Sequence, residues 1–154
     1  MKRIFKHEVI LDCPIARAFR YTTTMGHWPE WHPATQSVAG QTKKPGKAGD
    51  RVREKLRTAM FFSGTIDWKV VSSKPPRDWS LQTVTISLPL LNRARVRIDY
   101  HFSPEGKKKT RLTRLFRYDL PASLILLDAV YLRFKMESES QEALRRLQGS
   151  IRQP

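Results

Sequence analysis

The chain has 154 residues, of which 40% are hydrophobic, a size and apolar content that are typical of one folded domain and exclude a disordered chain. Its lone cysteine, Cys13, excludes an internal disulfide and a zinc site built from several cysteines, and it suits a reducing, cytoplasmic location. Lysine and arginine number 29 against 14 acidic residues, and the resulting net charge of +15 points to an anionic partner or surface.

One strand and two short helices are predicted at the N-terminal end. Residues 3–11 alternate between two faces, as in a strand, and contain no apolar run long enough for a signal peptide. Residues 14–22 begin with a proline and carry apolar side chains at helical spacing, which predicts a short helix. Residues 25–33 hold two further prolines, which limit the length of the second helix or turn predicted there.

Alternating segments separated by turn residues predict five more strands, at residues 51–60, 65–72, 79–88, 92–102 and 110–119. In the first of them basic residues occupy one face, and the other face carries Val52, Glu54, Leu56, Thr58 and Met60. The second places Ile66, Trp68 and Val70 inward. The facing of the third is ambiguous, because its apolar positions change phase: Trp79 and Leu81 compete with Val84, Ile86 and Leu88.

The last two strands have clear inner faces. Residues 92–102 place basic and polar residues outward, with these residues inward: Ala94, Val96, Ile98, Tyr100 and Phe102. On residues 110–119 an arginine, Arg114, shares the inner face with Leu112, Phe116 and Tyr118. An inward arginine on an otherwise apolar face needs a partner or water, so this strand marks a candidate polar site.

A long helix is predicted from Pro121 to the C-terminal end. Its apolar stripe consists of Leu124, Leu127, Tyr131, Phe134, Leu144, Leu147 and Ile151. The stripe turns polar around Ser138 and Gln141, where a helix packed only against a core would stay apolar. The apolar region at residues 120–134 is shorter than the roughly 20 residues that span a bilayer, so we expect no membrane span.

A sheet with one apolar face must be covered, and the last helix is the only long element left to cover it. The predicted order of one strand, two short helices, five further strands and a long helix resembles the polyketide cyclase/dehydrase and lipid-transport group of the START-related (SRPBCC) superfamily. Four segments carry the resemblance: DCPIARAF at 12–19, WPEWHP at 28–33, GDRV at 49–52 and TRLT at 110–113. The resemblance implies an α+β helix-grip fold, in which a curved antiparallel sheet of six or seven strands and two short helices accompany a long C-terminal helix. It also implies a single START-like ligand-binding domain over residues 1–154.

Sheet and helix are expected to enclose an apolar cavity, the usual kind of small-molecule site. The residues expected to bind the ligand are Trp31, Glu54, Leu56, Thr58, Trp68, Val96, Ile98, Tyr100, Arg114, Phe116 and Tyr118. The alternative is that these side chains pack a solid core. Arg114 is a candidate for holding a carboxylate or phosphate; its alternatives are an ion pair with Glu54 or escape to solvent. Trp31 is a candidate gate, and Trp28 is expected to pack in the core.

No catalytic set emerges from the titratable residues. His27 and His32 are five residues apart rather than one helical turn, and His101 is phased outward. We therefore predict no metal site and no cofactor, and we favour a protein that is not an enzyme. By analogy with the superfamily, Glu54 or a tyrosine would polarise a carbonyl in an aldol-type cyclisation.

The outward basic residues predict a basic convex sheet face, made by Arg51, Arg53, Lys55, Arg57, Arg93, Arg95, Arg97, Arg111 and Arg117. Such a face binds phosphates with little regard to sequence, or it only aids solubility. Three functions remain open. The first is binding or transport of a hydrophobic small molecule or lipid, and the second is a cyclase-, dehydrase- or hydrolase-like reaction in the same cavity. The third is a basic adaptor for RNA, the ribosome or an anionic membrane. In the membrane case, the apolar start of the last helix would enter the bilayer surface.

Overall fold

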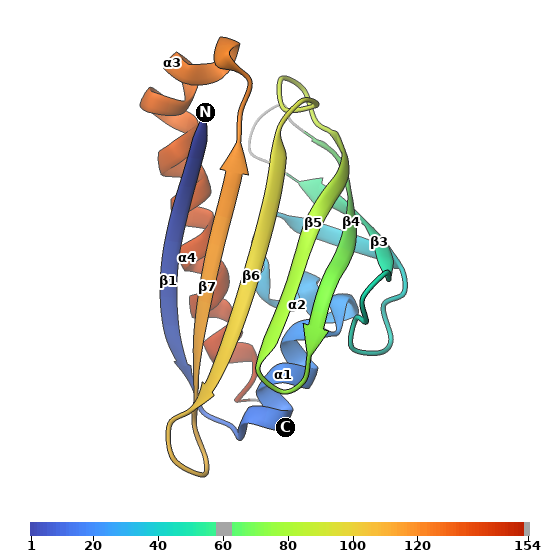
Figure 1. Cartoon of the computed structure of the whole chain (residues 1–154), viewed down its shortest axis with the longest axis vertical. Coiled ribbons are helices and arrows are strands. Elements are labelled where there is room, and N and C mark those ends of the chain that lie inside the picture. The colour runs from blue at the N-terminus through green and yellow to red at the C-terminus, as the bar shows by residue number, and fades with distance from the viewer. Residues whose placement is uncertain (58–62, 153–154) are drawn as a thin grey trace.

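A computed structural model describes residues 1–57 and 63–152 of the chain (Figure 1). The strands are β1 (Lys2–Leu11), β2 (Thr35–Gly40), β3 (Arg51–Arg57), β4 (Ser63–Lys74), β5 (Asp78–Ser87), β6 (Arg95–Pro104) and β7 (Thr110–Asp119). The N-terminal helices are α1 (Ile15–Thr23), η1 (Met25–His27) and α2 (Trp28–Trp31). The C-terminal helical region consists of η2 (Ala122–Leu124), α3 (Ile125–Leu127), η3 (Asp128–Leu132) and α4 (Arg133–Ser150).

The described strands form one antiparallel sheet in the order β1-β7-β6-β5-β4-β3-β2. β1 returns to pair with β7 along its whole length, from Lys2 opposite Asp119 to Leu11 opposite Thr110. All helices lie on one side of the sheet, and α4 runs behind β1 and β7 (Figure 1). This is the helix-grip fold that the sequence predicts.

β2 is the strand that the sequence pattern does not reveal. Its six residues show no alternation in burial, because Thr35 is buried while Val38 is only half-buried. The pairing with β3 is also interrupted by a bulge between Thr35 and Ser37. A short, irregular edge strand of this kind carries little periodic signal.

The inner face of the sheet forms most of the core. Burial alternates along β3, β4 and β6 as the sequence predicts, so Val52, Trp68 and Ile98 are buried. A bulge resolves the ambiguity in β5, since Asp67 pairs with Thr85 while the next residue of β4 pairs with Thr83. The intervening Val84 is exposed, and the inward phase therefore shifts by one residue between Leu81 and Ile86.

The C-terminal helix changes its geometry at η3, which is a π-helical segment. A π turn holds more residues than an α turn, so the inward face shifts along the sequence. Leu132 and Ser140 are buried, whereas Phe134 is 54% exposed. The predicted stripe is therefore wrong at Phe134. Ser140, near the polar interruption of that stripe, is the residue that faces inward.

Asp128, the first residue of η3, fixes this segment to the sheet. Its carboxylate has no exposed surface, forms an ion pair with Arg3 of β1 and accepts a 2.6 Å hydrogen bond from the hydroxyl of Tyr118 in β7. Both partners lie on neighbouring strands, so one buried side chain joins the helix to the paired ends of β1 and β7. No helix in the described part of the chain combines the length and apolar content needed to cross a bilayer.

Candidate ligand-binding site

A cavity of about 270 Å³ lies between the inner face of the sheet and the C-terminal helix. Its wall is largely aliphatic and aromatic, and it is formed by Trp28, His32, Ala34, Glu54, Leu56, Ile66, Trp68, Ile86, Leu88, Pro89, Leu90, Leu91, Ala94, Val96, Ile98, Tyr100, Phe116, Leu127, Tyr131, Leu132, Lys135, Met136 and Glu139. Leu90 and Tyr131 are 58% and 46% exposed, so the cavity reaches the surface beside them. Its volume lies near the lower end of the range for small-molecule sites, which favours a compact ligand.

The structure brings most of the predicted ligand-binding residues to this cavity. Glu54, Leu56, Trp68, Val96, Ile98, Tyr100 and Phe116 contribute to its wall. Trp31 has no exposed surface and does not line the cavity, and Thr58 lies outside the described residues. Tyr118 points away from the cavity toward Asp128, with which it forms a hydrogen bond.

Some residues of the cavity wall are not among those that the sequence predicts to bind a ligand. Ile66 and Ala94 were phased inward, so the strand pattern contained their signal. Leu132 and Met136 could not be found from an α-helical stripe, because the π segment brings them to the cavity. His32 follows α2, and its sequence position five residues after His27 gives no sign of a place in the cavity wall.

Arg114 lies beside the cavity rather than in its wall. Its side chain is fully buried, Nη1 donates to Oγ of Ser140 at 3.2 Å, and Nη2 donates to Nε2 of His32 at 3.1 Å. The guanidinium carbon lies 5.5 and 5.6 Å from the ring centres of Tyr100 and Phe116, both of which line the cavity. No ion pair within the described ranges includes Arg114, and its Nε has no hydrogen-bond partner. Neither an ion pair with Glu54 nor escape to solvent describes this residue.

The contact with Arg114 assigns the tautomer of His32. A guanidinium only donates hydrogen bonds, so Nε2 of His32 must accept and the ring proton must lie on Nδ1. Burial, followed by the positive charge of Arg114, lowers the pKa of His32 well below 6.5. His32 is therefore a neutral imidazole whose Nδ1–H can donate to a bound molecule.

Glu54 is a second buried titratable residue in the cavity wall. Its carboxyl group accepts hydrogen bonds from Oγ1 of Thr35 and, at 3.0 Å, from Nε1 of Trp68. Burial raises the pKa of Glu54 despite these donors, which favours the protonated acid. Burial also raises the pKa of Tyr100, which lines the same cavity.

Hydrogen-bond donors exceed acceptors around His32. The indole nitrogens of Trp28 and Trp31 are buried without a partner, as is Nε of Arg114. The rings of Trp28 and Trp31 lie 6.1 and 5.0 Å from the ring of His32. Of these three residues Trp28 is the one that lines the cavity. A buried donor without an acceptor costs free energy, so the indole N–H of Trp28 favours a ligand that brings an oxygen acceptor. Within the described ranges no group of histidine, cysteine and acidic residues could hold a metal ion.

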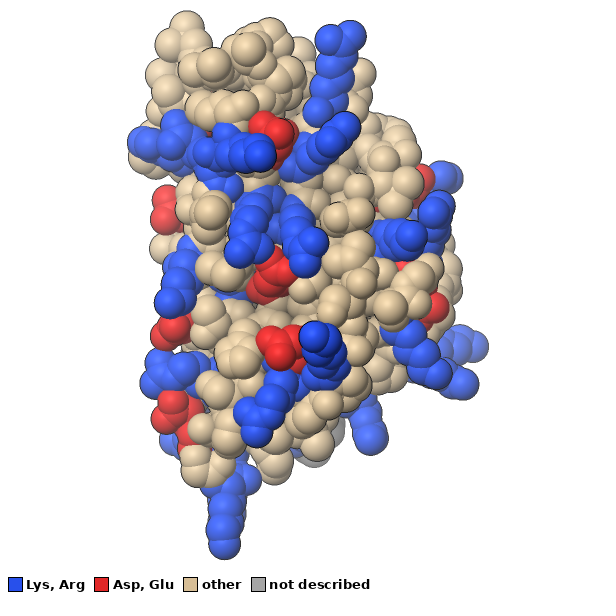
Figure 2. Space-filling view, viewed as in Figure 1, with Lys and Arg blue, Asp and Glu red and all other residues tan. Residues whose placement is uncertain are grey.

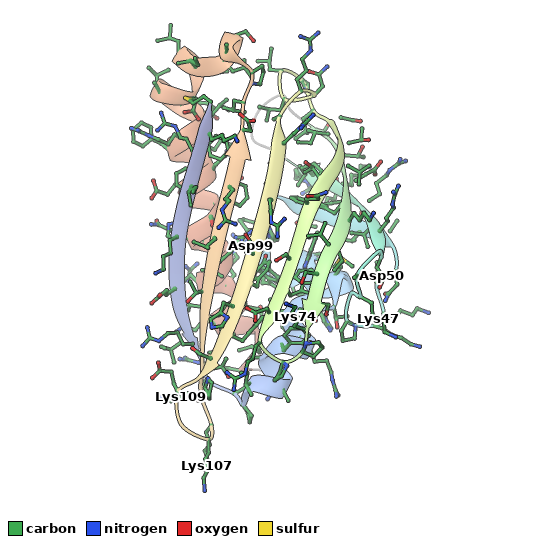
Figure 3. All side chains as sticks on the ribbon, viewed as in Figure 1. Lys47, Asp50, Lys74, Asp99, Lys107 and Lys109 are labelled. Carbon is green, nitrogen blue, oxygen red and sulfur yellow. The ribbon has the colours of Figure 1, made fainter. Side chains whose placement is uncertain are left out.

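The outer face of the sheet carries exposed basic residues interspersed with acidic ones (Figure 2). Arg53 pairs with Asp67. Asp99, labelled on β6 in Figure 3, pairs with both Arg97 and Arg117. An open groove of about 820 Å³ crosses this face, and Arg93 and Arg95 in its wall have no ion-pair partner among the described residues. Acidic residues thus neutralise part of the predicted basic face.

Comparisons with known proteins agree with this architecture. The Zhui aromatase/cyclase from Streptomyces sp. R1128 superposes with a TM-score of 0.77 at 15% identity, over 99% of this chain and 94% of that one. Ara h 8.0201 gives 0.74 at 14% identity, over all of both chains. A norcoclaurine synthase from Thalictrum gives 0.69 at 13% identity, over 97% of this chain and 96% of that one. At these identities the likeness concerns the fold.

Sequence comparison adds a curated relative and a family. Penitrem biosynthesis cluster 1 protein I of Penicillium ochrochloron is 28% identical over an alignment of 118 positions, and the match covers 70% of this chain and 70% of that protein. The family described as polyketide cyclase/dehydrase and lipid transport matches residues 2–152, almost the whole chain. The chain belongs to the polyketide cyclase/dehydrase and lipid-transport family.

Proposed function

We propose that the protein binds a compact, largely apolar small molecule that carries oxygen acceptors at one end. The observation that supports this most directly is the cavity of about 270 Å³, whose aliphatic and aromatic wall includes the neutral His32 and Trp28, with an indole nitrogen that has no hydrogen-bond partner. Apolar surface favours binding, and a few polar groups orient the ligand. Membership of a family that includes lipid transport and cyclase functions is in keeping with this role.

The test is to close the cavity without changing the surface. Ala94 is buried in the cavity wall, so Ala94→Phe fills part of the space, whereas Ala129→Phe adds the same atoms at an exposed position of η3. We expect the dye anilinonaphthalene sulfonate to bind wild type and Ala129→Phe saturably, and Ala94→Phe at least about tenfold more weakly. Circular dichroism must show that both variants are folded. Equal binding by a folded Ala94→Phe variant would place the dye elsewhere and remove the support for a cavity ligand.

The second candidate function is a cyclase-like reaction, favoured by the polar groups His32, Glu54 and Tyr100 in the cavity wall. Nε2 of His32 is occupied by Arg114, so its Nδ1–H can polarise a carbonyl but the ring cannot act as a base without breaking that contact. The hydroxyl of Tyr100 is a further donor, and Glu54, whose pKa is raised by burial, lies in the same wall. Such an array stabilises an enol or enolate oxygen during an aldol closure, in which a carbon–carbon bond forms between an enol carbon and a carbonyl carbon of the same molecule. Dehydration of the resulting alcohol then releases one water.

A linear 1,3,5-triketone separates the two functions. A cyclase would convert it to a ring product lighter by one water, detectable by mass spectrometry, and Glu54→Gln would slow the reaction by about 10²-fold or more. Saturable binding of the triketone without turnover would leave binding as the function. Turnover at the same rate in Glu54→Gln would exclude Glu54 from the reaction.

A further inference from the structure

We infer that the end of the molecule around the cavity mouth docks on a lipid bilayer that contains anionic lipids. The first observation is the distribution of exposed apolar side chains. Of the large hydrophobic residues exposed in the described structure, those at this end are Leu90, Ile125, Leu126, Val130, Tyr131 and Phe134, here called the mouth patch. The two others, Ile4 and Val84, lie on the outer face of the sheet.

In the helical part of the mouth patch, apolar side chains face solvent and a charged side chain faces the interior. A surface helix normally turns its polar side to water. Here Leu126, Val130 and Phe134, spaced by four residues, are 76%, 67% and 54% exposed. The inner side of the same segment holds the buried Asp128 with its partner Tyr118. Burying this apolar outer side would therefore be favourable, but no part of the described chain covers it.

The loop before β6 adds to the same patch. Leu90 is 58% exposed and has a φ of 67°, in the left-handed region that non-glycine residues rarely adopt. A leucine held outward by an unfavourable backbone conformation is costly in water. Because Leu90 and Tyr131 also line the cavity, the mouth patch reaches the opening of the cavity.

Cations outnumber acidic residues next to the helical part of the mouth patch, although Glu137 and Glu139 follow it and Glu139 pairs with Lys135. The only acidic residue between positions 122 and 136 is Asp128, which is buried. The guanidinium of Arg133 lies 4.6 Å from the ring centre of Phe134, and the exposed Arg93 and Arg95 have no ion pair with any described residue. Figure 2 shows an uncharged cap at the upper end of the molecule, where Figure 1 places α3, with mostly lysine and arginine and some acidic side chain atoms along its lower border.

An apolar patch bordered by cations fits a bilayer better than other partners. Aliphatic side chains enter the acyl region while lysine and arginine contact anionic headgroups. A second copy of this chain would bring like charges together, since each copy carries +15 and a symmetric contact would oppose the same cations. A nucleic acid would use the cations but leave the aliphatic side chains unsatisfied. Docking does not depend on the proposed function; only transfer of an apolar ligand from bilayer to cavity would rest on it.

Vesicle flotation tests the docking with matched pairs of variants of the whole chain. Wild type should bind vesicles of phosphatidylcholine containing about one third phosphatidylserine, and bind pure phosphatidylcholine at least about tenfold more weakly. Leu126→Asp combined with Val130→Asp should weaken binding to the anionic vesicles by at least about tenfold. The control, Ala16→Asp combined with Ala39→Asp, adds the same charge at exposed positions of α1 and β2, outside both the mouth patch and the groove that holds Arg93 and Arg95.

A second matched pair tests the cations. Arg93→Glu with Arg95→Glu reverses two charges in the wall of the outer-face groove, three and five residues after Leu90 of the mouth patch. Lys107→Glu with Lys109→Glu reverses two charges at the turn at the opposite end of the molecule (Figure 3). We expect the first pair to weaken binding clearly more than the second. Equal loss in both pairs, or equal loss in both aspartate pairs, would mean that charge alone binds the vesicles and would overturn the inference.

Two further outcomes would also overturn it. One is the absence of vesicle binding by wild type at low salt. The other is a wild-type dimer that Leu126→Asp with Val130→Asp converts to a monomer by sedimentation, without any vesicle binding, because the mouth patch would then be a contact between copies. Dye binding by the aspartate pair reports on the cavity separately, so failure of docking and failure of ligand binding remain distinguishable.

Discussion

Nη2 of Arg114 lies 3.1 Å from Nε2 of His32, and this contact joins the middle of β7 to the residue that follows α2. The arginine is fully buried, and no carboxylate within the described structure forms an ion pair with it. A buried cation with neutral partners is costly for folding. It also holds one nitrogen of His32 as an acceptor and so leaves the other as a donor.

We predict that Arg114→Met stabilises the protein. Methionine retains most of the volume and removes an unpaired buried charge, so the free energy of unfolding should rise by about 1 kcal/mol or more in urea titrations. The positive charge that lowers the pKa of His32 is also lost, so the His32 resonances should titrate at higher pH than in wild type. A variant several kcal/mol less stable than wild type would show that Arg114 contributes to folding instead.

Glu54 should make stability depend on pH. Burial raises the pKa of Glu54 above 4.5, so between 4.5 and the raised value the folded chain binds more protons than the unfolded chain. The contribution of Glu54 to the free energy of unfolding is complete below pH 4.5, and it is lost as the pH rises through the pKa of Glu54 in the folded chain. The stability of wild type relative to Glu54→Gln should therefore fall as the pH rises from 4.5. A difference that does not change with pH would contradict the raised pKa.

Ile98 tests the phase of the sheet. Ile98 is 3% exposed and its strand is paired on both sides, so Ile98→Asp buries a charge and should cost about 3–5 kcal/mol. Val84→Asp is the matched control, because Val84 is 47% exposed at a bulge and should cost less than about 1 kcal/mol. Thermal unfolding of the two variants makes the comparison. Similar melting temperatures would mean that the strand faces are assigned incorrectly.

Tryptophan fluorescence should report a ligand in the cavity. Trp28 and Trp68 line the cavity, whereas Trp79 is buried elsewhere with its indole nitrogen bonded to the carbonyl oxygen of Gly46. A long-chain fatty acid or an apolar aromatic compound should change the emission saturably in wild type and in Trp79→Phe. The change should shrink in Trp68→Phe. An unaltered response in Trp68→Phe would place the ligand away from this wall.

Strands that carry charge on one face could be predicted well from the sequence. Outward basic residues in β3 and β6 fix which side faces water, so the burial of Val52 and Ile98 follows from alternation alone. β2 could not be predicted, because its residues do not alternate. The bulge at Val84 appears in the sequence only as a phase conflict. Pairing with β4 resolves that conflict, and pairing cannot be deduced from one strand.

The candidate site could be predicted in outline only. Residues on inner strand faces reach the cavity because sheet curvature places them there, as with Trp68 and Tyr100. Arg114 has the same phase but lies beside the cavity, because the rings of Tyr100 and Phe116 stand close to its guanidinium. Side-chain packing of this kind is three-dimensional information that periodicity does not contain. The π segment likewise has no signal in an α-helical stripe.

Asp128 sets the rotational position of the whole C-terminal helix, because Arg3 and Tyr118 hold it at one point against the sheet. Twelve residues later along the same helix, Ser140 meets Nη1 of Arg114. Since each residue turns an α-helix by about 100°, inserting or deleting one residue between these two positions would rotate Ser140 away from the arginine while Asp128 stayed in place. The segment between them thus behaves as a spacer of fixed length, and changes of length are far less tolerable there than changes of side chain.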